Sequence, residues 1–488
     1  MGLSLYPRLG EVRTRARRAE RWRWYALFVV ATGMMVSVVN VSIVNVALPL
    51  MADDLEVDAA AIGWVVTGYL ITQATLLPIA GRASDLYGRR RLFIFGLLVM
   101  LVGSVLCATA PNAPSLVTFR VMQGIGAAVM PPIAFASVGE LFSPQERGRA
   151  MGTIVSVISI GPVIALGISG VLVSLAGWRS LFWLTPVFVL IALVGALLIL
   201  PERSPVRPAG RFDITGAVLA AAGLFPILLA FSRGAIWGWT SGATLGLLGA
   251  GAALLTIFVW HESRTDEPMI ALDLFRLRSL RTANLASMTG AATLFGVLLV
   301  LPFYMSAVLG YGPIGLALGI MPVAIAYTVV SPFAGRGINR FGADRVAMTG
   351  YALAAAGTLG LAAGAAGQSY VAILPGILAL SAGLAFATSP ITVVAISEVP
   401  PARLGVASSF PNISRYTGGA FGAAILGAVL TASVPVDDLT DVSPEVADRV
   451  VDGFTNASLI AVIFLGLAFL AAWRMPGSPG PAPGDRPT

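Results

Sequence analysis

A short polar segment between two apolar stretches carries the residue types best suited to proton and ion chemistry. Its glycines and charged residues are Gly81, Asp85, Gly88, Arg89 and Arg90. A carboxylate and several arginines are costly in hydrocarbon, whereas glycines let neighbouring helix ends approach closely. We therefore expect the segment on the cytoplasmic face of a membrane. There the Asp85 carboxylate can rest against the positive end of a helix that starts near Arg403 and latch one conformation.

Two arginines, Arg120 and Arg415, fall inside apolar stretches without an obvious carboxylate partner. Charged residues inside a membrane usually face a cavity or pair with other polar groups. For Arg120 we expect hydrogen bonds to amides such as Asn40 or Asn45. Arg415 has two equally open roles, as a cation that binds substrate or as a strut that donates to backbone carbonyls. Further candidates for a cavity are Trp64, Tyr69, Gln73, Tyr304, Asn412 and Tyr416.

The composition indicates the class of protein in which these residues act. Of the 488 residues, 57% are hydrophobic and 11% are charged, and the mean hydropathy is +0.86. Soluble globular domains carry about 25% charged residues. Apolar runs of about 20 residues recur along the chain, and helices of that length span a bilayer. The predicted fold class is all-α, a polytopic membrane protein.

Other classes of function lack their motifs. The single cysteine, Cys107, and the single histidine, His261, form neither a disulfide framework nor a metal cluster. The sequence has no phosphate-binding loop or nucleophile arrangement, so we expect no enzyme activity, metal, cofactor or nucleic acid partner. Apolar and aromatic walls with few polar anchors suit a small amphiphilic substrate, handled by a monomer among membrane lipids. Because the two interior arginines are uncompensated, neutral or anionic cargo is expected rather than quaternary cations.

The apolar runs predict fourteen membrane helices, arranged as six, two and six. Most of the 31 basic residues, all arginines, then lie in cytoplasmic segments, while Arg179, Arg233 and Arg449 lie outside. This bias places both termini in the cytoplasm, with the chain in the cell (inner) membrane. The expected divisions are a basic segment 1–24, a six-helix bundle 25–200, linkers with two inserted helices 201–280, a six-helix bundle 281–473 and a disordered tail 474–488.

An internal repeat supports this arrangement. The segment from Gly81 to Gly88, after the second helix, is similar to a less well matched segment from Gly335 to Arg345, after the tenth helix. If these positions correspond, the ninth helix repeats the first and the two inserted helices stand between the repeats.

Three details of the helices can be checked directly. The fourth helix is predicted over 115–140. The last helix is predicted over 455–473, after an acidic outer loop. Gly418 and Gly422 are spaced four residues apart, which favours a close approach of their helix to a neighbour.

The polar segment resembles the signature loop of the major facilitator superfamily, Gly-x-Leu-x-Asp-Arg-x-Gly-Arg-Arg. Two glycines, Asp85 and two arginines match, whereas Ala83 and Leu86 depart from the pattern. Other stretches are similar to motifs of the fourteen-helix drug:proton antiporters, or EmrB/QacA-type multidrug exporters. They are Val44–Pro49, Arg120–Gly126, Gly161 and Pro162 with Gly167 in the fifth helix, Trp178–Phe182, and Phe212 with Asp213. The resemblance implies a major facilitator fold and an antiporter for multidrug efflux and antibiotic resistance.

One departure from that resemblance bears on the energy source. Members of this branch usually carry an aspartate in the first helix as the favoured proton site, and Asn40 stands at the equivalent position here. An amide does not titrate. The expected function is secondary active export of amphiphilic organic compounds by alternating access, coupled to protons through another group. The alternative is an uncoupled or differently coupled facilitator or flippase for a neutral or anionic lipid or metabolite.

Overall fold

The computed structural model describes residues 21–57, 59–143, 146–201, 213–265, 272–399, 410–433 and 444–476. Within these ranges the regular secondary structure is helical, as the sequence predicts. The first group of helices comprises α2 (Trp22–Asp54), α3 (Ala59–Tyr87), α4 (Arg89–Ala108), α5 (Ala113–Ala128), α6 (Met130–Leu141), α7 (Arg147–Ala176) and α8 (Arg179–Leu198).

Two helices, α9 (Ile214–Trp237) and α10 (Gly242–Glu262), follow the first group. A short 3-10 helix, η1 (Leu272–Arg276), precedes the second group. That group comprises α11 (Arg278–Ala307), α12 (Pro313–Phe341), α13 (Ala343–Ala365), α14 (Tyr370–Ser397), α16 (Phe410–Ser433) and α17 (Pro444–Trp473).

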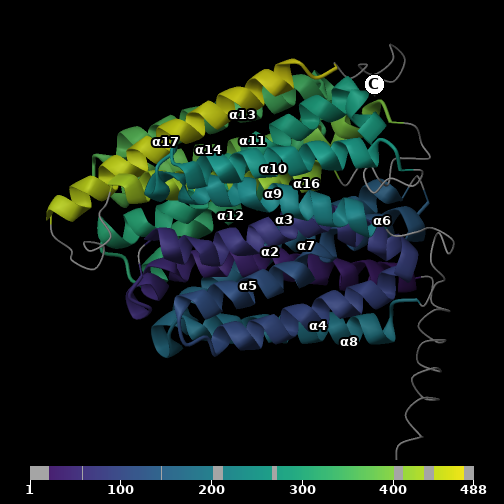
Figure 1. Ribbon diagram of the computed structural model, residues 1–488, viewed down its shortest axis with the longest axis horizontal. Coiled ribbons are helices and arrows are strands. Elements are labelled where there is room, and N and C mark those ends of the chain that lie inside the picture. The colour runs from purple at the N-terminus through teal and green to yellow at the C-terminus, as the bar shows by residue number, and fades with distance from the viewer. Residues whose placement is uncertain are drawn as a thin grey trace, which may run out of the picture.

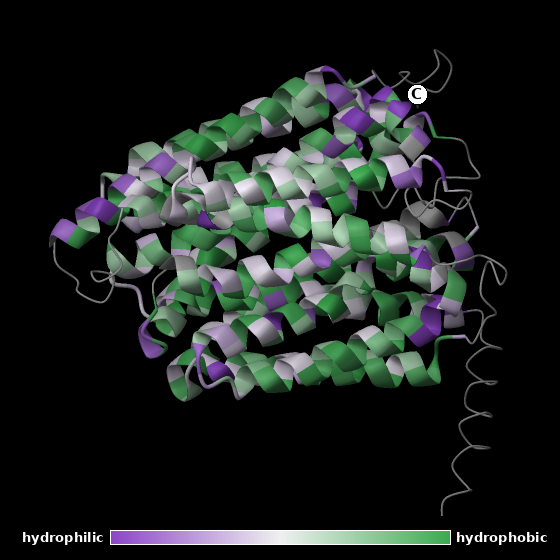
Figure 2. Cartoon of the chain, in the orientation of Figure 1, coloured by the Kyte–Doolittle hydropathy of each residue, from purple (hydrophilic) through white to green (hydrophobic). Residues whose placement is uncertain are grey.

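The lengths and compositions of the helices suit a membrane. In the described part of the chain, 12 helical spans are long and apolar enough to cross it, with α5 and α6 joined in one of them. α3 and α7 have 29 and 30 residues and carry the shorter apolar stretches Ala61–Leu77 and Ile160–Ala176. The long helices run side by side, and hydrophilic residues gather toward their ends (Figures 1 and 2). Large apolar side chains such as Ile463, which is 62% exposed, face outward. Exposure of apolar surface is unfavourable in water and favourable in lipid. The chain is a multi-pass membrane protein.

The helix predicted over 115–140 is not continuous. It breaks at Val129 into α5 and α6, and Pro131 and Pro132 follow the break directly. Proline has no amide hydrogen to donate to the preceding turn, so two consecutive prolines interrupt the hydrogen-bond ladder. The predicted fourth membrane span is therefore present as Ala113–Val138, with a break at Val129 that the prediction did not include.

The last helix begins earlier than predicted, at Pro444 instead of residue 455. Its first turns bury Val446 and Val450 and expose Glu445 and Asp448. These turns are amphipathic, so the acidic side chains reach solvent from a helix rather than from a loop. Part of the segment predicted as an outer loop is therefore helical.

The two groups of helices repeat one packing scheme. In the first group α2 packs on α7, α3 on α5, and α4 on α5 and α8; in the second, α11 packs on α16, α12 on α14, and α13 on α14 and α17. The turns after α3 and α12 also match, because Gly88 and Gly342 have φ angles of 91° and 90°. Glycine suits such a conformation since it has no Cβ atom. The predicted repeat is confirmed, with α11 in the place of α2.

The two groups meet along two seams. α7 packs on α12, and α3 packs on α16. Because α12 repeats α3 and α16 repeats α7, these seams are equivalent in the repeat. α9 and α10 pack on each other, and α9 also packs on α16 and α3. The teal pair α9 and α10 in Figure 1 therefore lies against the α3–α16 seam.

Candidate functional site

The arginines of the polar turn tie α4 to neighbouring helices. Arg89 donates a hydrogen bond to a carbonyl of α6 at 3.0 Å and pairs with Glu140 at 2.5 Å. Arg90 donates to two carbonyls in the last turn of α8, at 3.2 and 3.1 Å. A cation at the C-terminal end of a helix complements the helix dipole. Together with the positive φ of Gly88, these contacts fix the direction in which α4 leaves α3.

The remaining members of the turn are described less completely. Gly81 lies next to α6, where an added Cβ would meet Pro132 Cβ at 3.6 Å, an ordinary contact. The side chain of Asp85 lies outside the described residues, and so does the predicted helix start near Arg403. The latch formed by Asp85 therefore stays a prediction.

Arg120 of α5 lies at the centre of a buried polar network in the first group. It is 0% exposed, and its Nε donates to the Val65 carbonyl at 2.9 Å. Its Nη1 donates to Gln123 Oε1 at 2.8 Å and to Asn40 Oδ1 at 3.5 Å. Its guanidinium carbon lies 4.3 Å from the centre of the Tyr69 ring, within the range of a cation–π contact. The predicted contact with Asn40 is confirmed.

Three more hydrogen bonds extend this network over α2, α3 and α8. The Tyr69 hydroxyl donates to the Ser37 carbonyl at 2.9 Å, and the Gln73 amide donates to the Ser37 hydroxyl at 2.8 Å. The Asn40 oxygen accepts from the Thr185 hydroxyl at 3.3 Å. All of these side chains are buried. The predicted residues Asn40, Tyr69, Gln73 and Arg120 therefore belong to one packed core, held by neutral partners.

The motif in the fifth predicted helix faces two different neighbours. In α7, which carries Pro162 in its interior, Gly161 packs so closely on α2 that an added Cβ would collide with Met35. Gly167 faces the second group, where a Cβ would meet Met321 Cε of α12 at 3.4 Å. Gly170, one turn further, would meet Ala317 Cβ at 2.8 Å. Small residues therefore let α7 pack within its own group and across the seam.

The α3–α16 seam joins residues from both groups. The Tyr416 side chain of α16 lies beside the Gln73 amide of α3. Further along, Phe421 of α16 packs edge-on against Phe231 of α9, with ring centres 5.0 Å apart. On α3, the Trp64 ring lies 5.6 Å from the guanidinium carbon of Arg233 of α9. Trp64 and Tyr416 are therefore seam residues.

A cavity lies within the second group, between α11, α12, α13, α14 and α16. Its empty volume is about 520 Å³, including the space open at its mouth. Its polar lining consists of Ser287, Tyr327, Tyr351, Thr388, Thr392, Asn412 and Arg415, and its apolar lining includes Leu294, Leu384 and Ile391. The structure thus brings Asn412 and Arg415 together at one cavity, as a few polar anchors among apolar walls.

Arg415 is half-buried and has few partners. Its polar contact is with Tyr327, whose ring centre lies 5.8 Å from the guanidinium carbon. Among the described residues no carboxylate and no backbone carbonyl accepts a hydrogen bond from it. The strut role considered for Arg415 therefore has no support in these contacts.

Two predicted cavity residues lie elsewhere. Tyr304 of α11 is 0% exposed, and its hydroxyl donates to the Ala365 carbonyl at 2.9 Å. Its ring packs on Phe454 at 4.6 Å between centres, so Tyr304 is a packing residue and does not line the cavity described above. Asn45 of α2 is buried, and its Oδ1 has no hydrogen-bond partner among the described residues.

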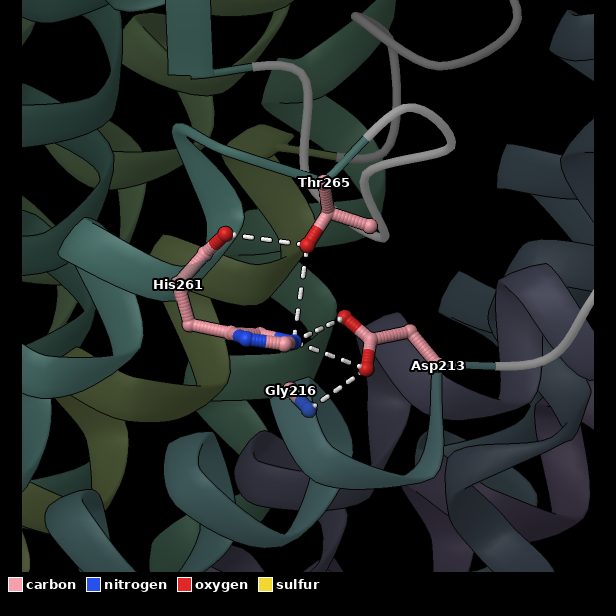
Figure 3. Close-up of polar contacts among 4 residues, drawn as sticks. All are labelled: Asp213, Gly216, His261 and Thr265. Carbon is pink, nitrogen blue, oxygen red and sulfur yellow. Dashed lines mark hydrogen bonds and ion pairs between the residues drawn. The ribbon is translucent and has the colours of Figure 1, made fainter.

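A polar cluster closes one end of the inserted pair (Figure 3). Asp213 caps α9 by accepting from the Gly216 amide at 2.8 Å, and both its oxygens lie 3.0 Å from His261 Nε2 of α10. Thr265 donates to the His261 carbonyl at 2.9 Å. The cluster joins the start of α9 to the end of α10, so the chain's single histidine holds the hairpin together.

A second ion pair joins helix ends in the first group. Arg23 of α2 forms two hydrogen bonds with Glu146, each 3.0 Å long. Glu146 also accepts from the Ser143 hydroxyl at 3.0 Å and from the Ser143 amide at 3.3 Å. The bonds from Ser143, and then the charge of Arg23, lower the pKa of the Glu146 carboxyl below its ordinary value.

The sequence alone missed most of the cavity lining. Ser287, Tyr327, Tyr351, Thr388 and Thr392 come from four successive helices, α11 to α14. Isolated hydroxyls in apolar helices give no periodic signal, because serine and threonine also donate to their own helix. Of the lining residues, Arg415 gave the clearest sequence signal for a cavity, because it is a charged residue inside an apolar stretch. Gly170 was detectable as a second small residue on the face of Gly167, three residues along the helix.

Two bundles with one packing scheme, seams between them and no strand in the described residues define a helical membrane protein built from a duplicated unit. Members of one large transporter family share this architecture. The chain belongs to the Major Facilitator Superfamily, whose family model matches residues 30–423. It is a transporter and not an enzyme.

Similar sequences include resistance proteins of actinobacteria. The chain is 33% identical over 373 residues to the multidrug resistance protein B homolog of Mycobacterium tuberculosis (strain ATCC 25618 / H37Rv), covering 75% of this chain and 69% of that protein. It is 30% identical over 459 residues to the puromycin resistance protein pur8 of Streptomyces alboniger, covering 92% of this chain and 91% of that protein.

Solved structures support the same fold. A bacterial homologue of the human lysosomal transporter Spinster, inward-facing and unoccupied, matches with a TM-score of 0.65 and 16% identity over 94% of this chain and 98% of that chain. The human organic anion transporter MFSD10 (TETRAN) matches with a TM-score of 0.63 and 16% identity over 91% and 99%. At this identity the likeness concerns the fold alone.

Proposed function

We propose that the chain is a proton-coupled secondary exporter of amphiphilic organic compounds, drugs or metabolites, in the fourteen-helix drug:proton antiporter branch. The observation that carries this proposal is the similarity to resistance proteins, which spans 92% of the chain in the relative from Streptomyces alboniger. Counting α3 and α7 with the 12 apolar spans gives fourteen crossings. An even number puts both termini on one side, and the arginine bias makes that side the cytoplasm of the cell membrane.

The transport cycle in this proposal is alternating access between two rigid bundles. The bundles are residues 25–200 and 281–473, joined through the inserted segment 201–280. Two equivalent seams, α7 on α12 and α3 on α16, let the bundles rock about a site between them. The chain works as a monomer among membrane lipids.

The test is flux in proteoliposomes. Reconstituted protein should move a fluorescent amphiphile faster when a pH gradient is imposed than when the gradient is collapsed by an ionophore. Protein-free liposomes measure leakage in each condition. Equal protein-dependent rates with and without the gradient would contradict proton coupling, and no protein-dependent flux of any amphiphile would contradict the transport proposal.

The second candidate is an uncoupled facilitator or flippase for neutral or anionic molecules. It is favoured by Asn40, an amide at the position where the branch usually carries an acid, and by the placement of the described acidic residues at helix ends. An Asn40→Asp variant places a carboxylate 3.5 Å from the Arg120 guanidinium, near enough for an ion pair. If coupling has been lost at this position, the variant should acquire a pH dependence of flux, and an unchanged profile would count against this candidate.

A further inference from the structure

We propose that the cavity of the second group binds the anionic group of the cargo, a carboxylate or a phosphate ester, through Arg415. This inference rests on the proposed transport function and names its substrate class as anionic amphiphiles.

The charge of the cavity favours an anion. The Arg415 guanidinium lines it, half-buried, and no carboxylate of the described residues pairs with it. An uncompensated cation in the low dielectric of a membrane protein is costly, and a bound anion removes that cost. Tyr327 holds the guanidinium in place without neutralising it.

The hydroxyl groups of the lining leave recognition to Arg415. Ser287 donates its proton to the Pro411 carbonyl at 2.8 Å, and Tyr351 donates to the Ala286 carbonyl at 2.8 Å. Thr388 likewise donates to the Leu384 carbonyl at 2.8 Å. Because backbone carbonyls take up these three protons, they are not available to an anion, whereas bonds from the guanidinium to an anion are charge-assisted.

A second observation supports an additional polar occupant. Asn284 of α11 lies three residues, about one turn, before the cavity residue Ser287. It is 6% exposed, and neither its amide nitrogen nor its amide oxygen has a hydrogen-bond partner among the described residues. Buried polar groups are usually satisfied, so an unpartnered amide beside the cavity has capacity for a bound polar group.

The position of the cavity suits an amphiphile. Tyr416, the residue after Arg415, lies beside Gln73 of the other group. Arg415 therefore lies one residue from a contact between the two groups, and the apolar lining residues Leu294, Leu384 and Ile391 can contact the adjoining hydrocarbon of the cargo.

The test uses the full chain in detergent and two fluorescent probes, a dansyl-labelled long-chain carboxylic acid and its methyl ester. Wild-type protein should bind the acid about tenfold more tightly than the ester, the size of one charge-assisted hydrogen-bonded pair. Arg415→Gln should remove this preference by weakening acid binding about tenfold while ester binding changes less than about twofold. Arg415→Lys should keep part of it, and Arg179→Gln, which removes an arginine that lies outside the cavity and pairs with Asp54, should keep all of it.

The outcomes separate the inference from the proposed function. Equal weakening of acid and ester by Arg415→Gln would assign the residue a merely structural role and overturn the inference. If that variant does not fold, an equal affinity of wild-type protein for acid and ester overturns it as well. Displacement of the acid by equimolar inorganic phosphate would identify a free-anion site and overturn the assignment to cargo. If only the ester is transported in proteoliposomes, the inference fails while the exporter proposal stands.

Discussion

The two bundles each bury an arginine and treat it in opposite ways. In the first bundle Arg120 is 0% exposed and donates to a carbonyl and two side-chain amides, while the Tyr69 ring covers its face. In the second bundle Arg415 is half-buried, contacts Tyr327 and faces a cavity. The closed polar core involves α2, α3 and α5, and their equivalents α11, α12 and α14 line the open cavity together with α13 and α16.

The difference separates two uses of a charge inside a membrane. Arg120, whose Nε and Nη1 donate to neutral protein groups, ties together the helices of its own bundle, while its Nη2 has no hydrogen-bond partner among the described residues. A cation left facing a cavity costs free energy until a ligand arrives, so it marks a binding site. The same reasoning assigns structure to the first bundle and cargo recognition to the second.

The largest effect is expected from Arg120→Ala. The change removes hydrogen bonds from α3, α5 and α2 and leaves an empty volume in a packed core, so it should lower the free energy of unfolding by about 2–5 kcal/mol. Thermal unfolding in detergent measures the loss. Arg415→Ala is the matched control and should leave the unfolding temperature nearly unchanged. Equal shifts in the two variants would remove the contrast between the bundles.

A smaller effect is expected from replacing glycines with alanine, and it should differ between a glycine packed within a bundle and a glycine packed between bundles. Gly418→Ala places a methyl group against the Met288 carbonyl of α11, and backbone cannot yield, so stability should fall by about 1–3 kcal/mol. Gly170→Ala meets Ala317 across the α7–α12 seam, where the bundles can separate slightly. It should therefore slow transport more than it lowers stability. The paired readouts are unfolding temperature and flux, and the reverse pattern would contradict this division.

The smallest effect is expected at the exposed pair of Arg23 and Glu146. Because the folded state lowers the pKa of Glu146, its contribution to stability is present above the ordinary value of 4.5 and is lost as the pH falls through the lowered value. Glu146→Gln should therefore unfold with a flatter dependence on pH in this acidic range and behave like wild type at neutral pH. Identical pH profiles would argue against this tie between α2 and the start of α7.

Much of the fold could be predicted because hydropathy, glycine spacing and charge bias act locally. The repeat was visible in Gly88 and Gly342, and Gly418 and Gly422 do bring α16 close to α11. Two details were missed for local reasons as well. Two adjacent prolines interrupt the fourth predicted helix at Val129, and the amphipathic, acidic first turns of the last helix resembled a loop.

The candidate site was less predictable, because it depends on which helices become neighbours. Hydropathy measures the transfer of a side chain into lipid. It does not predict which other side chain that residue will contact. Asn40 and Arg120 could be paired from polarity alone, yet Tyr304 has the same polarity as Tyr327 and packs away from the cavity. The cavity lining is thus a property of the packed bundle.

The inserted hairpin makes the duplicated architecture mechanically unequal. α9 packs on α3 of one bundle and α16 of the other, and the contacts of Asp213 with His261 fasten it to α10. The α3–α16 seam therefore carries a third helix, whereas the equivalent α7–α12 seam has no such addition among the described residues. In the proposed alternating-access cycle, sliding of α3 past α16 would have to displace α9, so the two seams would resist movement unequally.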